Sequence, residues 1–195
     1  NGSASFKPYF GAIIIMKKLT LKISAFVLFV SISSFANDVQ VSQKKLTLNG
    51  DIFYIKGVCY HPVPLGSKHR SFDTIDQDLA LMKEAGINTL RVYKPIDDIK
   101  ILDKIASYGI KVIISFGYNQ NGFFDILSGT YIDYVKKYKD HDAILLWELG
   151  NEYNYHPEWF GGDIANWYNA LNNASIKIHT IDKNHPVSTA HGDLH

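Results

Sequence analysis

Two short apolar stretches decide the fold: residues 111–116 read Lys-Val-Ile-Ile-Ser-Phe, and residues 143–149 read Ala-Ile-Leu-Leu-Trp-Glu-Leu. Both have the length of a strand, and their mostly apolar composition favours strands that are buried on both faces. Between them, Tyr131, Val135 and Tyr138 recur at helical spacing. A buried strand, an amphipathic helix and a second buried strand are the unit that connects parallel strands.

The same alternation continues on both sides of this unit. Further strands are expected over residues 54–60 and 88–93 and from residue 186 to residue 190. Apolar residues at helical spacing mark three more helices, namely Ile75, Leu79 and Met82, then Ile99, Leu102 and Ala106, and finally Ile164, Trp167, Leu171, Ala174 and Ile178. Thr74 and Gln77 are spaced as a capping box for the first of these helices. Parallel strands joined by right-handed crossovers predict an α/β fold.

A hairpin is expected before the first parallel strand. Residues 39–41 and 46–48 alternate apolar and polar side chains, as strands with one exposed face do. Asn49-Gly50 stands between Leu48 and Ile52 and is a strong signal for a tight turn between two strands.

Polar side chains at the strand ends favour a barrel over an open sheet. No Gly-x-Gly-x-x-Gly follows the first parallel strand, so a dinucleotide-binding sheet lacks its main support. Polar and aromatic residues instead follow the carboxyl ends of several strands, and these are His61, Tyr93, Tyr118-Asn119, Asn151-Glu152 and His191. Active sites of (β/α)8 TIM barrels lie at that rim, and a complete barrel takes about 250 residues. We therefore expect residues 37–195 to form the N-terminal part of a TIM barrel, cut after about five βα units.

The first 36 residues are expected to lie outside the fold. Residues 16–36 open with a methionine, carry three lysines before the apolar run 23–32, and close on small residues, as a bacterial-type secretory signal peptide does. The run is short for a membrane span, which needs about 20 residues, and an uncleaved anchor is the alternative. Residues 1–15 precede that methionine and are interpreted as an upstream non-native or untranslated segment. The expected location is periplasmic or secreted, with no stable membrane anchor after cleavage.

The composition is that of a globular protein, since 46% of the 195 residues are hydrophobic and 20% are charged. Four of the 20 Lys and Arg lie in the first 36 residues, so cleavage leaves 16 cationic residues against 19 acidic ones. Without a strongly basic block, nucleic acid is not expected as a partner, and neutral small molecules or polymers are. Cys59 is the single cysteine, which excludes an internal disulfide and a cysteine-based zinc site.

The chemistry is expected where the fourth parallel strand ends, in Trp147-Glu148-Leu149-Gly150-Asn151-Glu152. Alternation places Glu148 and Glu152 on one face of a straight strand, but Gly150 leaves the phase beyond it open. A carboxylic acid that aromatic rings screen from water can keep its proton near neutral pH, as a general acid must. Trp147 and Tyr153 are expected to provide that screen for Glu152. The alternative is that Glu152 caps a helix or lies on the surface.

This segment resembles a known catalytic motif. Residues 144–152, Ile-Leu-Leu-Trp-Glu-Leu-Gly-Asn-Glu, look like the acid/base motif of retaining glycoside hydrolases of the large (β/α)8 clan. Residues 48–62 are similar to the beginning of the family 2 barrel domain within that clan, and residues 78–93 fit the same pattern. The three motifs keep the expected order, and the resemblance covers nearly all of residues 46–192.

The resemblance implies a role for each candidate residue. Glu152 would be the general acid/base, Asn151 would hydrogen-bond the sugar 2-hydroxyl, and Arg91 would keep the nucleophile carboxylate ionised. For Arg91, an ordinary salt bridge on the barrel is the alternative. His61 would line the sugar subsite. Further substrate-binding candidates at the rim are Tyr93, Tyr118, Asn119, Trp147 and His191, of which the aromatic residues are alternatively core residues. No cofactor and no metal are implied.

Departures from the family pattern leave the substrate open. Family 2 enzymes usually carry β-sandwich domains before the barrel, whereas here the candidate signal peptide leads almost directly into it. The second parallel strand ends Arg91-Val-Tyr-Lys-Pro95, where many family 2 enzymes have a Ser-His pair. This ending is closer to β-1,3-glucan hydrolases and glucanosyltransferases of the clan, so a β-glucan is a candidate among the oligo- and polysaccharides, and transglycosylation is a candidate beside hydrolysis. The clan's nucleophile, a glutamate ending strand seven, falls beyond His195, so this chain alone is expected to be inactive.

Two other classes of protein are alternatives for the same residues. A metal-dependent hydrolase on this barrel normally shows His-x-His at the end of strand one, where this chain has Cys59-Tyr-His61. A non-catalytic carbohydrate-binding barrel is the stronger rival, because it keeps the aromatic rim without needing Glu152. A glutamate at the end of strand seven in the full-length gene would favour the enzyme.

Overall fold

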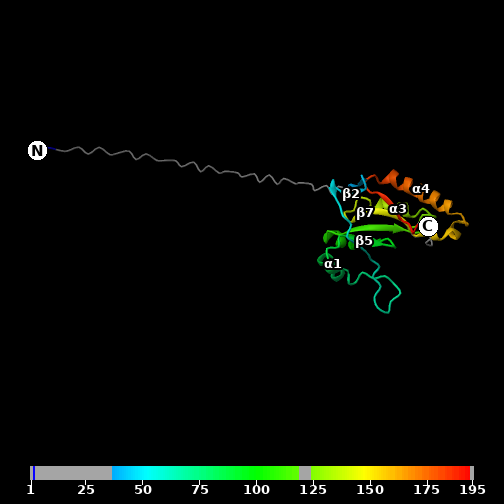
Figure 1. Cartoon of the computed structure of the whole chain (residues 1–195). Coiled ribbons are helices and arrows are strands. Elements are labelled where there is room, and N and C mark those ends of the chain that lie inside the picture. Colours follow the sequence, from blue (N-terminus) through cyan, green and yellow to red (C-terminus); the bar gives the residue numbers. More distant parts are fainter. Residues whose placement is uncertain (1, 3–36, 119–123, 194–195) are drawn as a thin grey trace. The chain divides into compact units, whose positions relative to one another are not determined.

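The computed structural model describes residues 2, 37–118 and 124–193 of the chain (Figure 1). The expected signal peptide, residues 16–36, lies outside the described residues, as do Asn119 and, apart from residue 2, the segment 1–15. Within the described part, no helix combines the length and the apolar character that crossing a bilayer requires.

Five parallel strands form the central sheet. In spatial order, which is also their sequence order, they are β4 (Gly57–Cys59), β5 (Thr89–Val92), β6 (Lys111–Phe116), β7 (Ile144–Asn151) and β8 (Val187–Ala190). Each strand pairs in parallel with the next one along the chain. The expected α/β fold is confirmed, with the strand order of successive barrel units.

Within the described residues, four α-helices connect the strands at the places that helical spacing predicts. They are α1 (Ile75–Glu84), α2 (Ile99–Ser107), α3 (Tyr131–Tyr138) and α4 (Ile164–Ile181). Asp98 and Asp163 cap α2 and α4 through their side chains. The capping box expected at Thr74 and Gln77 is wrong, because the Thr74 hydroxyl donates to the Asp78 carboxylate over 3.2 Å and makes no cap bond.

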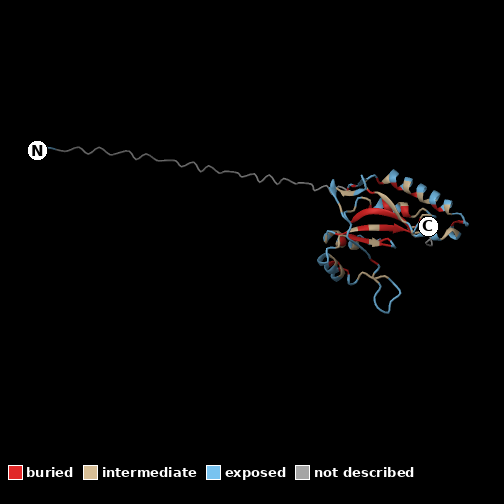
Figure 2. Ribbon diagram, in the orientation of Figure 1, coloured by how far each residue is buried: buried red, intermediate tan, exposed pale blue. Residues whose placement is uncertain are grey.

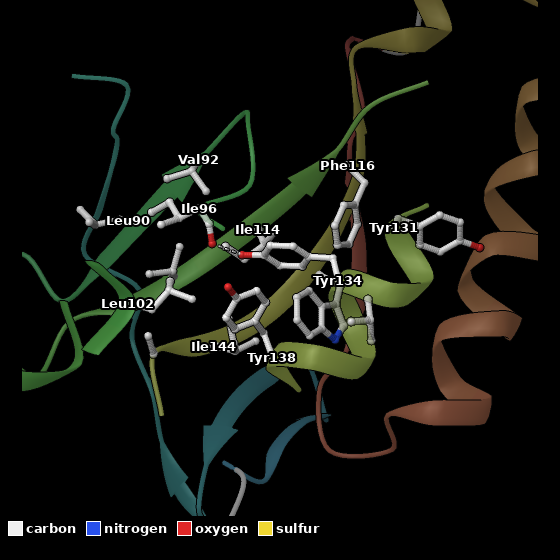
Figure 3. Close-up of a cluster of buried hydrophobic side chains, with 14 of the residues drawn as sticks. Leu90, Val92, Ile96, Leu102, Ile114, Phe116, Tyr131, Tyr134, Tyr138 and Ile144 are labelled. Carbon is white, nitrogen blue, oxygen red and sulfur yellow. Dashed lines mark hydrogen bonds between the residues drawn. The ribbon is translucent and has the colours of Figure 1, made fainter. Parts of the chain in front are cut away.

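One face of the sheet packs against the helices. Strand alternation supplies its buried apolar residues, which are Leu90 and Val92 of β5, Ile114 and Phe116 of β6, and Trp147 and Leu149 of β7. Figure 3 shows this layer beside α3, where the Tyr134 hydroxyl donates to the Ile96 carbonyl over 2.7 Å. Figure 2 shows the central strands as largely buried and the helices with exposed outer sides. Residues in between on the same strands, Arg91, Ser115 and Glu148, therefore point to the opposite face.

Trp147 belongs to this packed layer and not to the rim, which corrects the expectation that it contacts a sugar. Its fully buried ring stacks on Phe116 with centroids 5.8 Å apart, and its Nε1 donates to Asp182 Oδ2 over 2.7 Å. His185 Nδ1 lies 2.8 Å from the same oxygen. Burial raises the pKa of the Asp182 carboxyl, but hydrogen bonds from His185 and Trp147 outweigh burial and hold that pKa below its usual value. The cluster ties β7 to the end of α4.

The expected hairpin is confirmed at the start of the described chain. Three antiparallel strands form it, β1 (Val39–Ser42), β2 (Lys45–Leu48) and β3 (Asp51–Ile52). Asn49 and Gly50 have φ values of 53° and 90°, the left-handed pair that an Asn-Gly turn favours. Just before β1, Asn37 Nδ2 donates to the Ile144 carbonyl over 3.1 Å. The hairpin is therefore attached at the N-terminal end of β7, opposite to the end where Asn151 lies.

Candidate active site

A buried ion pair joins two strands of the sheet on the face away from the helices. Arg91 of β5 donates from Nε to both carboxylate oxygens of Glu148 on β7, over 2.9 and 3.0 Å, and from Nη2 to Glu148 Oε1 over 2.7 Å. The side chain of Arg91 is 19% exposed and that of Glu148 is 7% exposed. Two-point contact of this kind fixes the plane of the guanidinium as well as its position.

The same guanidinium extends the pair to the rim. Arg91 Nη2 donates to Asn151 Oδ1 over 2.8 Å, and the Ser115 hydroxyl of β6 donates to Glu148 Oε1. Burial lowers the pKa of Arg91, but the hydrogen bonds and the charge of Glu148 outweigh burial and raise that pKa above its usual range. Arg91 therefore remains a cation, held between Glu148 and Asn151.

Cys59 and Tyr93 complete the surroundings of Arg91. The Arg91 guanidinium lies over the Tyr93 ring, 4.6 Å from its centroid, and the Tyr93 hydroxyl donates to Cys59 Sγ over 3.2 Å. This hydrogen bond raises the pKa of Tyr93. Tyr93 is 47% exposed, so its ring offers an apolar and polarisable surface beside the cation, as expected for a residue at the rim.

Glu152 lies at a sharp turn where β7 ends. Gly150 and Glu152 both have left-handed backbones, with φ of 73° and 55°, and the Glu152 N–H donates to the Ala190 carbonyl over 2.7 Å. The turn separates the two glutamates that a straight strand would align: Glu148 is buried in the ion pair, whereas Glu152 is exposed. Since Trp147 lies on the opposite face, it does not screen Glu152, and that expectation is corrected as well.

Several other expected residues lie elsewhere. Tyr153 and Tyr118 belong to an aromatic cluster against α4, with the Tyr118 N–H donating to the Tyr153 hydroxyl over 3.1 Å. His191 Nε2 lies 2.9 Å from the hydroxyl of Tyr168 on α4. His61 is exposed. The structure therefore brings together Arg91, Tyr93 and Asn151 of the expected site residues, and it leaves His61 and His191 outside this network.

Three residues of the network were not expected as site residues: Cys59, Ser115 and Glu148. Along a strand, side chains alternate between the two faces of the sheet, and residues two apart share a face. That alternation was available from the sequence, since Arg91 and Tyr93 are two residues apart and Glu148 stands opposite Trp147 on its strand. Which residues of different strands meet was not available, because it depends on the register between strands.

Replacing Gly150 is expected to destabilise the fold for two reasons: the added side chain would clash with its neighbours, and the left-handed backbone disfavours other residues. A Cβ there would lie 2.8 Å from Trp167 Cζ2 and 2.8 Å from Tyr153 Cδ2, and its φ is left-handed. We expect Gly150→Ala to lose about 1–3 kcal/mol of unfolding free energy from the clash, in addition to about 1–2 kcal/mol from the backbone. Gly129→Ala is the matched control, because Gly129 has a φ of 79° and open space around its Cα. Urea denaturation measures both, and equal losses would contradict the clash.

Comparison with known proteins shows a similarity to one family of glycosidases. The family model described as glycosyl hydrolases family 2, TIM barrel domain, matches residues 39–132. A β-galactosidase of Alteromonas mediterranea is 24% identical over 133 residues, and a β-galactosidase of Lactococcus lactis is 23% identical over 130 residues. These alignments cover 62% and 60% of this chain, and 13% of each relative. The chain therefore spans a small part of the length of these relatives.

Solved structures share the fold. A GH2 β-galacturonidase from Eisenbergiella tayi matches with a TM-score of 0.62 and 22% identity, over 80% of this chain and 28% of that one. β-Glucuronidase 3 of Bacteroides uniformis matches with a TM-score of 0.65 and 16% identity, over 78% of this chain and 20% of that one. Together with the family match, this similarity identifies the five-stranded sheet as part of a (β/α)8 TIM barrel and confirms the resemblance drawn from the motifs.

Proposed function

We propose that the protein cleaves or transfers β-glycosides with retention, with Glu152 as general acid/base. The proposal starts from the match of residues 39–132 to the TIM barrel domain of glycosyl hydrolases family 2. The observation that carries the proposal is that Asn151, which accepts a hydrogen bond from Arg91, and the exposed Glu152 follow one another at the carboxyl end of β7. That end of the strands is where TIM barrels perform their chemistry.

In this mechanism Glu152 protonates the leaving oxygen and later removes a proton from the attacking water or sugar hydroxyl. A second carboxylate, about 5–5.5 Å away, attacks the anomeric carbon. Glu148 does not suit that second role, since it is buried and accepts hydrogen bonds from Arg91 and Ser115. We assign the nucleophile to a later strand of the barrel, as the resemblance implies.

The substrate proposed is a β-linked oligo- or polysaccharide. The similar proteins bear the names β-galactosidase, β-glucuronidase and β-galacturonidase, which differ in the sugar and share the β-linkage. The strand ending Arg91-Val-Tyr93 keeps a β-glucan among the candidates. The exposed ring of Tyr93 supports a sugar at this rim, because a sugar ring presents apolar C–H groups to an aromatic face. A signal peptide at residues 16–36 would direct the protein to the periplasm or the medium.

Proton NMR of the first-formed product tests the mechanism. The protein expressed from its complete gene is given aryl β-galactoside, β-glucoside and β-glucuronide in turn, and the anomer that appears before mutarotation is identified. We expect the β-anomer with at least one of them. An α-anomer as first product would refute the retaining mechanism. Binding of glycans without turnover of any glycoside would favour the non-catalytic carbohydrate-binding barrel.

A further inference from the structure

Glu148 has its carboxylate committed to protein partners. Both of its oxygens face Arg91, and Oε1 also accepts from Ser115. With a side chain 7% exposed, Glu148 is shielded from solvent within the described residues. A carboxylate in this position is a poor candidate for contact with substrate. It does control the orientation of the guanidinium to which it is hydrogen-bonded.

The guanidinium in turn orients the amide of Asn151. Arg91 Nη2 carries two hydrogens, one directed to Glu148 Oε1 and the other to Asn151 Oδ1 over 2.8 Å. A guanidinium has donors and no acceptors, so the amide oxygen of Asn151 must face it and the amide nitrogen must face away. The charge of Arg91 thus decides between the two orientations of the amide, which have nearly the same shape.

We propose that Glu148, acting through Arg91, is a positioning residue that presents the Asn151 amide N–H groups to the ligand and so selects for a sugar hydroxyl oxygen at that point. The inference rests on the proposed function and on the contact between Asn151 and the sugar 2-hydroxyl that the family resemblance implies. Without the carboxylate, the guanidinium loses its two-point anchor and the Asn151 oxygen loses its fixed donor. The amide is then free to turn, and its contact with the hydroxyl weakens.

A merely structural counterion would behave differently. If Glu148 only neutralised Arg91 inside the barrel, its loss would lower activity on every glycoside by the same factor. If Glu148 positions Asn151, the loss depends on whether the substrate carries the hydroxyl that Asn151 contacts. The comparison between substrates therefore separates the two roles, even when the variant is less stable than the wild type.

The test compares Glu148→Gln with the wild type, expressed from the complete gene, on matched aryl β-glycosides with and without the 2-hydroxyl. We expect kcat/KM to fall about 10- to 100-fold on the 2-hydroxy glycoside, the range for a hydrogen bond that involves a charged group, and less than about 3-fold on the 2-deoxy glycoside. Glu84→Gln, an exposed glutamate of α1, is the matched control and should change neither. In an Asn151→Ala background, Glu148→Gln should have little further effect on either substrate.

The comparison of the two substrates supports or refutes the positioning role of Glu148. Equal losses on both substrates, with an active wild type, overturn the positioning role and leave the proposed function standing. A wild type without glycoside turnover overturns the proposed function and this inference with it. If Glu148→Gln does not fold, Ser115→Ala replaces it, because it removes one hydrogen bond from Glu148 and keeps the ion pair. A several-fold loss confined to the 2-hydroxy glycoside supports the proposal there, and an equal loss on both refutes it.

Discussion

Replacing Glu152 with Gln is expected to lower kcat/KM for glycosides with poor leaving groups by about 10²–10⁴-fold, the usual contribution of general acid/base catalysis. The amide has nearly the same size as the carboxyl but cannot donate a proton to the leaving oxygen. An activated aryl glycoside, whose leaving group needs little protonation, should still form the covalent intermediate. The measurement is the ratio of rates on the two kinds of substrate, in the protein expressed from its complete gene.

Azide should then restore turnover of the activated substrate, because azide attacks without a general base. The exposure of Glu152 at the turn after β7 gives a small anion access to the space beside it. Glu158→Gln is the control, since Glu158 follows Glu152 in the same connection between β7 and α4 and its side chain is 62% exposed. If Glu152→Gln lost both kinds of substrate equally, with no rescue by azide, Glu152 would be a structural residue or the nucleophile.

Replacing Arg91 with Met is expected to cost about 3–5 kcal/mol of unfolding free energy, because it leaves the Glu148 carboxylate buried without its cation. The loss should be larger than the value of the ion pair itself, since most of it is the penalty for an unpaired buried charge. The double variant Arg91→Met/Glu148→Met should therefore recover much of the stability, because it removes that charge as well. Urea denaturation of the single and double variants measures both effects.

Lys137→Met is the matched control, because it removes the same charge from an exposed ion pair. Lys137 Nζ lies 2.7 Å from Asp97 Oδ1, and the two side chains are 56% and 46% exposed. An exposed pair of this kind contributes little to stability, so the loss should be much smaller than for Arg91→Met. Similar losses for Arg91→Met and Lys137→Met, or no recovery in the double variant, would mean that the Arg91–Glu148 pair is not effectively buried.

Local patterns predicted most of the architecture. The apolar runs at 111–116 and 143–149 became β6 and β7, because a continuous apolar run needs burial on both faces and a parallel sheet between helices provides it. Asn49-Gly50 predicted its turn, since few other residues adopt two successive left-handed conformations. The capping box at Thr74 failed because the Thr74 backbone, with φ of −101° and ψ of 12°, lies outside the extended region that a capping residue adopts.

The sequence predicted several residues of the candidate site, but it did not predict which of them contact one another. The sequence by itself determined that Arg91, Asn151 and Glu152 come at the carboxyl ends of strands, because strand ends can be read from composition. Only the tertiary structure decided that Arg91 forms its ion pair with Glu148, 57 residues away, and not with another carboxylate. It also decided that Trp147 faces α3 and α4, and that Gly150 turns Glu152 away from Glu148. The physical reason is that pairing across a parallel sheet depends on register and on left-handed turns, and a single-residue shift in either would move each side chain to the opposite face.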